Sequence, residues 1–279
     1  MRGQSAEDIE GLSPRNVLFI VTLSHTMQHI FVGSSILFPL IISELNIDYT
    51  EFGLAVAIAA SIGGLSQIVF SIASRKIARY LLLGVGNMLL STGVFITGLS
   101  RKLLDFIVAR LLSGIGAAPQ HPMGTAIVSE KFDSESIGRA LGFHYGVAYI
   151  GNIIGPILMT ASAMALGWRG TFLVFSIPIL LVGFIIVWYL GRDPGISRGG
   201  TDAYAIGCLK SDLSKILKTK GIIAVIASSD RNLRRGRCWD ANYLHPYIPS
   251  RFYRDRCIRE KLGIRYRSSW RIHRSAYTR

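Results

Sequence analysis

LLDFIVARLLSGIGAAPQHPMGTAIVS, residues 103–129, is the most informative segment of this chain. It is apolar and long enough to cross a bilayer, because about 20 helical residues at ~1.5 Å each span the hydrocarbon core. It nevertheless contains Arg110, and a charge at that depth is costly and usually functional. Arg110 and His121 are eleven positions apart, which places them only about 20° apart around a helix. Gly114 and Ala117 lie along the same strip, so we expect a polar stripe that faces away from lipid.

Apolar blocks of similar length recur on both sides of this segment. Half of the 279 residues are hydrophobic, and a helix satisfies all of its own backbone groups inside lipid. The first block is too long for the core of a signal peptide. We therefore predict an all-α membrane protein, a bundle of six transmembrane helices followed by an irregular basic tail. The helices are expected at residues 17–42, 51–73, 80–99, 103–129, 137–166 and 171–190.

The distribution of basic residues predicts the orientation of this bundle. With the N-terminus inside, the inner segments up to residue 230 hold thirteen Lys and Arg, and the outer loops hold three. Lys and Arg are enriched in cytoplasmic loops, so we predict a multi-pass protein of the plasma membrane with a cytoplasmic N-terminus. The expected organisation is a cytoplasmic tail (1–16), the six-helix bundle (17–194) and a cytoplasmic link (195–220).

The last part of the chain has a different character. Residues 221–230 resemble the start of a seventh helix, which stops too early to span a bilayer. Residues 231–279 carry eleven of the fourteen net positive charges and show no helical or strand period. We interpret 231–279 as a disordered, out-of-frame tail, because a one-base shift permits codons for apolar residues. A basic arm for anionic lipid is an alternative; without a recognisable motif we do not expect a nucleic-acid partner.

Further polar residues in the apolar blocks extend the candidate site. His25 and His29 are four positions apart and share a face of the first helix, with Gln28 between them. On the fifth helix, His144 and Asn152 are candidates to contribute from across a cavity. The histidines could form hydrogen bonds between helices, or they could bind protons that are coupled to transport. We name all of these, together with Arg110 and His121, as candidates for substrate or proton coupling.

Two purely structural interpretations of Arg110 stay open beside the functional one. Its long side chain could reach toward the headgroups, or it could tie neighbouring carbonyl groups together. We find no Ser/His/Asp arrangement, acid pair or metal motif, so we expect neither an enzyme, nor a metal site, nor a cofactor. The three cysteines, Cys208, Cys238 and Cys257, lack the spacing of metal ligands.

Several short motifs occur in an order that resembles the major facilitator superfamily. The fourth helix carries Arg110-x-x-x-Gly114-x-Gly116, and the fifth carries Gly151-x-x-x-Gly155-Pro156, positions where small residues permit close helix packing. The basic loop after the second helix holds Arg75, Lys76 and Arg79, with Ser74 in place of the family's Asp. The resemblance covers residues 17–194, and it implies one half of a twelve-helix transporter.

This resemblance implies secondary active transport of a small organic solute by alternating access. The coupling would be that of a symporter or an antiporter, with protons as the candidate ion. Arg110 favours an anion, since guanidinium pairs well with carboxylate or phosphate, but a drug-like solute stays open. Because alternating access needs two bundles, a lone half would be inactive, act with a missing C-terminal half, or form a homodimer. The alternative is a non-transporting membrane scaffold or an inert pseudogene fragment.

Overall fold

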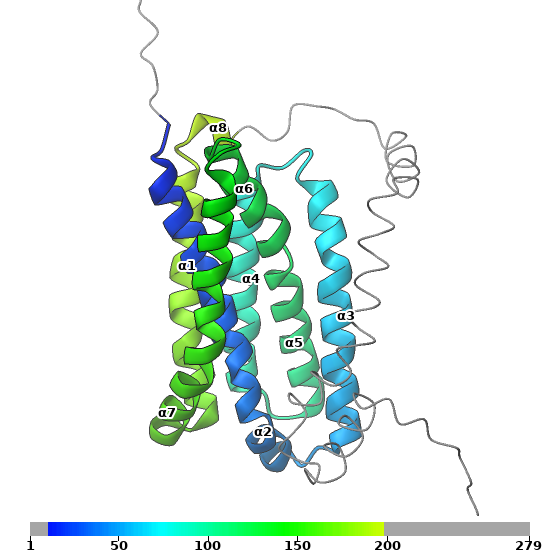
Figure 1. The fold of residues 1–279 in the computed structure, drawn as a ribbon. Helices are drawn as coiled ribbons and strands as arrows, with labels where there is room; N and C mark the ends of the chain where they lie inside the picture. Colours follow the sequence, from blue (N-terminus) through cyan, green and yellow to red (C-terminus); the bar gives the residue numbers. More distant parts are fainter. Residues whose placement is uncertain (1–10, 198–279) are drawn as a thin grey trace, which may run out of the picture. The chain divides into compact units, whose positions relative to one another are not determined.

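The computed structural model describes residues 11–197, and all of its regular elements are helical (Figure 1). They are α1 (Pro14–Val32), η1 (Gly33–Leu37), α2 (Phe38–Leu45), α3 (Tyr49–Ala73), α4 (Arg79–Leu99), α5 (Leu103–Ala117), η2 (Gln120–Gly124), α6 (Thr125–Lys131), α7 (Ile137–Ile185), η3 (Ile186–Leu190) and α8 (Pro194–Ser197). The abortive seventh helix, the basic tail and nearly all of the predicted link lie outside the described residues.

The first membrane crossing is a broken helix. The segment α1–η1–α2 runs over Pro14–Leu45 and is long and apolar enough to span a bilayer. Pro39 lies in the first turn of α2, directly after the 3-10 turn η1. Proline lacks the backbone N–H that a continuous helix would use, so a break is expected at this point. Asn46 then ends α2 in the left-handed conformation, with φ 50°.

Helix α4 is central and α3 is peripheral. In the most apolar window of each helix, 61% of the residues of α4 are buried, compared with 17% for α3. Helix α4 packs on α5 and α7, whereas α3 packs mainly on α5 and stands at one side of the bundle in Figure 1. The side chain of Asp48 caps α3 by accepting a hydrogen bond from the Thr50 N–H at 2.7 Å. That bond lowers the pKa of this carboxyl group.

Helix α7 supplies two membrane crossings. Its 49 residues would extend about 74 Å as one straight helix, which is far longer than a bilayer is thick. The backbone leaves the helical region at Gly167, with φ 68° and ψ 168°, and the chain turns back there (Figure 1). The hydroxyl groups of Thr171 and Ser162 meet across the turn at 3.1 Å. The bundle therefore has the predicted six crossings, with the fifth and sixth joined by a glycine corner instead of a loop.

Charged side chains form hydrogen bonds and ion pairs between neighbouring helices at both ends of the bundle. Next to the glycine corner, Glu44 of α2 accepts hydrogen bonds from Trp168 and from Arg169, the latter at 2.9 Å. At the opposite end, Asp193 is buried and accepts hydrogen bonds from Lys131 and from the Leu12 N–H. Burial alone would raise the pKa of Asp193, but these bonds outweigh it and hold the pKa below its ordinary value.

Candidate functional site

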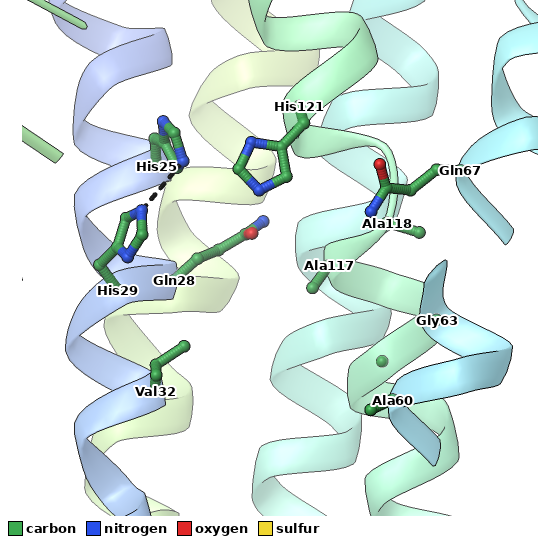
Figure 2. A pocket seen from close by; sticks show the side chains of 11 residues that line it. His25, Gln28, His29, Val32, Ala60, Gly63, Gln67, Ala117, Ala118 and His121 are labelled. Carbon is green, nitrogen blue, oxygen red and sulfur yellow. Dashed lines mark hydrogen bonds between the residues drawn. The ribbon is translucent and has the colours of Figure 1, made fainter. Parts of the chain in front are cut away.

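A continuous chain of hydrogen bonds links α1 to the first arm of α7. The hydroxyl of Thr22 lies 3.0 Å from His144 Nδ1, and His144 Nε2 lies 3.0 Å from His25 Nδ1. His25 Nε2 is 3.2 Å from His29 Nε2, a contact drawn in Figure 2. His29 Nδ1 is 2.9 Å from Asn152 Oδ1. We call these five residues the histidine chain; every ring nitrogen of its three imidazoles has a partner.

The helical register explains how α1 contributes to this chain. Thr22, His25 and His29 recur at intervals of three and four residues and so lie on one face of α1. Two glycines of α7 bring this face close: a Cβ on Gly151 would lie 2.7 Å from the Thr26 carbonyl oxygen. A Cβ on Gly155 would lie 2.7 Å from the Ile30 carbonyl oxygen. These glycines of the Gly-x-x-x-Gly-Pro segment allow the two backbones to approach.

A second polar cluster joins α1 to α4 and η2. Ser24 Oγ lies 2.7 Å from Gln120 Oε1 and 3.1 Å from Asn87 Oδ1, and all three residues are buried. The Gln28 amide donates to Gln120 Oε1 at 3.4 Å. Gln120 and Thr22 are absent from our sequence-based candidates. Thr22 could have been found, because it is three residues before His25 on the same helix; Gln120 gives no such signal.

A cavity of about 230 Å³ opens beside both clusters. In Figure 2, His25, Gln28 and His29 line one side of it and His121 projects from another element, with Gln67 of α3 beyond. The complete lining is His25, Gln28, His29, Val32, Ala60, Gly63, Gln67, Gly114, Ala117, Ala118 and His121. Pockets for drug-sized ligands measure roughly 300–1,000 Å³, so this cavity is a partial site.

The predicted stripe on residues 103–129 is split. Gly114, Ala117 and His121 line the cavity, but Arg110 is not among the lining residues. The expectation assumed one straight helix; in fact α5 ends at Ala117 and the π-turn η2 follows. His121 is exposed, and its ring centre lies 5.0 Å from that of His25. Its side chain takes no part in the hydrogen bonds found among residues 11–197.

Arg110 is a half-buried cation whose hydrogen bonds are incomplete. Its Nε and Nη1 atoms are inaccessible to water and have no hydrogen-bond partner among the described residues. The guanidinium carbon lies 5.3 Å from the ring centre of Phe31 and 5.7 Å from that of Phe38. Aromatic faces attract a cation but do not replace hydrogen bonds. The group can therefore accept an anionic partner.

The remaining motif residues occupy structural positions. Gly116 lies against the backbone of Leu90 on α4, too close for any side chain at position 116. Pro156 lies inside α7, against Gly33. In the loop after α3, Lys76 is exposed and Arg75 is half-buried; neither forms an ion pair within residues 11–197.

Arg79 of the same basic loop has a partner. It pairs with Glu130 of α6, and the neighbouring Lys131 pairs with Asp193. These two ion pairs link the start of α4, the end of α6 and the segment before α8 at one end of the bundle. Among residues 11–197 no group of three or more His, Cys, Asp or Glu side chains is arranged to hold a metal ion.

Comparison with curated proteins points to one family. The family model described as the Major Facilitator Superfamily matches residues 17–229. The chain is 30% identical to a probable L-galactonate transporter of Escherichia coli, over 53% of this chain and 32% of that protein. It is 24% identical to the riboflavin transporter RibZ of Clostridioides difficile, with the same coverage. The sialic acid transporter NanX of Escherichia coli is 26% identical, over 50% of this chain and 34% of that protein.

A solved structure has the same arrangement of helices. It is a crystal structure of a bacterial homologue of the human lysosomal transporter Spinster, in an inward-facing, occupied conformation, with a TM-score of 0.60 and 20% identity. The match covers 70% of this chain and 48% of that chain. At this identity the likeness concerns the fold alone. The chain spans about a third of the length of the curated relatives named above.

Proposed function

The chain belongs to the major facilitator superfamily, whose members are transporters and not enzymes, and from this premise we propose that it transports a small organic acid. Arg110 is the observation that carries the proposal. Two buried guanidinium nitrogens without hydrogen bonds are unfavourable unless a partner satisfies them. A carboxylate is the partner that guanidinium geometry fits best, because it accepts two parallel N–H bonds.

Two of the three curated relatives named above support the same class of solute. They are named for L-galactonate and for sialic acid, and both compounds carry a carboxylate beside several hydroxyl groups. Around the cavity, Gln28, Gln67 and His121 are neutral polar side chains of the kind that bond hydroxyl groups. We propose that the carboxylate pairs with Arg110 and that the polyol portion occupies the cavity.

Transport by alternating access also requires a second bundle. The cavity is small, and the apolar residues Leu54, Ile58, Ile62 and Leu65 of α3 are exposed beside it. We propose that a second six-helix bundle completes the site, supplied by a C-terminal half or by a second copy of the chain, and that rocking of the two bundles exposes the site alternately. Crosslinking in native membranes tests this: a specific homodimer or hetero-partner supports it, and transport by a monomer contradicts it.

Membrane placement belongs to the same proposal. We place the protein in the plasma membrane with its N-terminus in the cytoplasm. The cluster of Arg79, Glu130, Lys131 and Asp193 would then lie at the cytoplasmic end, and the glycine corner at Gly167 would face outside. The excess of Lys and Arg in the inner segments supports this orientation.

Uptake of radiolabelled L-galactonate into proteoliposomes containing the full chain tests the proposed activity. Loss of a buried charge-assisted pair costs about 2–5 kcal/mol, so we expect Arg110→Ala to reduce uptake about 100-fold, and Arg110→Lys to retain part of it. Arg101→Ala, in the exposed turn before α5, is the matched control and should transport normally. Undiminished uptake by Arg110→Ala would reject the role of this residue. No uptake by the unaltered protein, in vesicles where crosslinking shows the second bundle, would reject the solute class.

A further inference from the structure

The histidine chain has a fixed number of places for hydrogen atoms. It contains four contacts, Thr22–His144, His144–His25, His25–His29 and His29–Asn152, and each contact holds one hydrogen. The carbonyl oxygen of Asn152 can only accept, so His29 Nδ1 must donate to it. With all rings neutral, His29 Nε2 then accepts from His25, His25 Nδ1 accepts from His144, and His144 Nδ1 accepts from the Thr22 hydroxyl. The neutral chain therefore fills its four contacts with four hydrogens.

One additional proton also fits without breaking a contact. A hydroxyl can accept as well as donate, and a helical threonine can turn its hydrogen toward a carbonyl of the preceding turn. When the Thr22 hydroxyl turns in this way, the lone pair of His144 Nδ1 is free to take a proton from a hydronium ion that reaches this buried end when the proposed rocking of the bundles opens it, and the hydronium is left as water. The new N–H donates to Thr22, and the positive charge rests on His144. Four contacts still hold four hydrogens.

The charge can then move along existing hydrogen bonds. Transfer of the His144 Nε2 hydrogen to His25 Nδ1, across 3.0 Å, leaves His144 neutral and charges His25. Transfer of the His25 Nε2 hydrogen to His29 Nε2, across 3.2 Å, leaves His25 neutral and charges His29. Two hops therefore carry the charge from the fully buried His144 to His29 on the cavity wall. A second excess proton would exceed the four contacts and would break one of them.

We propose that Thr22, His144, His25, His29 and Asn152 form a relay that holds at most one excess proton and moves it between the buried end of the chain and the cavity. The relay deepens the proposed transport function by naming one proton as the coupled ion, and it rests on that function for its role. Because the three rings act as one site, it differs from three independent histidines, which could together bind three protons.

The groups around the relay do not neutralise its charge. The titratable side chains that face it are His121 of η2, 5.0 Å from His25 between ring centres, and Tyr145 and Tyr149 of α7. Tyr145 lies 5.4 Å from His25, and Tyr149 lies 4.9 Å from His29. The neutral Gln67 of α3 lines the same cavity as His25 and His29, and the neutral Asn87 and Gln120 bond to Ser24 of α1. Among residues 11–197 no Asp or Glu forms a hydrogen bond or an ion pair with its histidines.

Within the described residues no carboxylate is bonded to the relay. This predicts the sign of the coupling between proton binding and solute binding. A proton on His29 is a cation at the cavity wall, and an anionic solute in the cavity would stabilise it by Coulomb attraction. Linkage is reciprocal, so the bound proton would increase the affinity for the anion by the same factor. A neutral solute would give no such coupling.

Solid-state NMR of the full chain in phosphatidylcholine bilayers, with ¹⁵N-labelled histidine, tests the relay without any solute. We expect scalar couplings across the two N–H···N contacts and, as the pH is lowered, uptake of one proton shared by three rings. Two or more protons on these rings, or titration of one ring while the other two stay unchanged, would overturn the proposal. Because no transport is measured, failure of the relay and failure of the transport function are separate results.

A pair of threonine variants sharpens the test. Thr22→Val removes the acceptor at the buried end, and because a hydrogen bond to a charged group is lost, we expect proton affinity to fall about tenfold or more. Thr26→Val, one turn later on α1, is the matched control. Within residues 11–197 the Thr26 hydroxyl bonds only to the Thr22 carbonyl oxygen, so this variant should leave proton uptake unchanged. Equal proton affinity in the two variants would contradict the relay. If Thr22→Val does not fold, the scalar couplings between ring nitrogens in the unaltered protein test the relay by themselves.

Discussion

The histidine chain and Arg110 are polar features of the same membrane-embedded bundle. They differ in how many of their hydrogen-bonding groups have a partner. All six ring nitrogens of His25, His29 and His144 have hydrogen-bond partners within the protein. Two nitrogens of Arg110 have none among the described residues. Buried polar groups are nearly always satisfied, so the contrast separates two roles. We propose that the histidines act with protons alone and that Arg110 pairs with an anion.

The largest expected effect comes from deleting one member of each feature. His144→Leu removes the partner of the Thr22 hydroxyl and of His25 Nδ1, so we expect the free energy of unfolding to fall by about 2–4 kcal/mol. Arg110→Leu removes a cation that is already incompletely paired, and we expect a change within about 1 kcal/mol or a gain in stability. Equilibrium unfolding in mixed micelles measures both variants. Equal destabilisation by the two substitutions would remove the contrast.

A smaller effect is expected from separating the helices that carry the chain. A side chain at Gly151 would meet the Thr26 carbonyl oxygen and the His29 Cβ, so Gly151→Val should cost about 1–3 kcal/mol by overpacking. Gly146→Val, on the same helix, is the control because a Cβ there has no neighbour within 4 Å. Unfolding measurements on both variants check this. If Gly146→Val were as costly as Gly151→Val, contact with α1 would not be the reason.

The sequence predicts part of this contrast and not the rest. The apolar blocks predict the six crossings, Pro39 predicts the break in the first, and the spacing of His25 and His29 predicts their common face. These are local properties of helices. The insertion of His144 beside His25 depends on the packing of α7 against α1, which no local period encodes. The position of Arg110 outside the cavity lining depends on how α5 ends before η2. A helical wheel that advances by about 100° for every residue does not predict this end of the helix.

Asp193 provides a reference for a buried charge that is fully paired. The pKa of Asp193 is held below its ordinary value, so its pairing stabilises the fold at neutral pH and is lost as pH falls through the folded-state pKa. We expect Asp193→Asn to lower stability by about 1–2 kcal/mol at pH 7 and to have a progressively smaller effect as the pH falls below the ordinary aspartate value of about 3.9. Melting temperature as a function of pH measures the difference. A difference that grows toward acid pH would have the wrong sign.

The smallest expected effect is at the partly exposed pair of Arg79 and Glu130, whose side chains are 30% and 36% exposed. Solvent screens such pairs, so we expect a coupling free energy below about 1 kcal/mol. A double-mutant cycle with Arg79→Ala and Glu130→Ala measures it. A coupling as large as the effect of Asp193→Asn would show that exposure does not rank the charges of this bundle.

Solute-dependent stabilisation tests the assignment of Arg110 most directly. A ligand that binds only the folded state raises the melting temperature in proportion to its occupancy. We predict that L-galactonate raises the melting temperature of the bilayer-embedded protein, that its neutral lactone, which lacks the carboxylate, does not, and that Arg110→Ala responds to neither. An equal rise for L-galactonate in Arg110→Ala and in the unaltered protein would contradict the account.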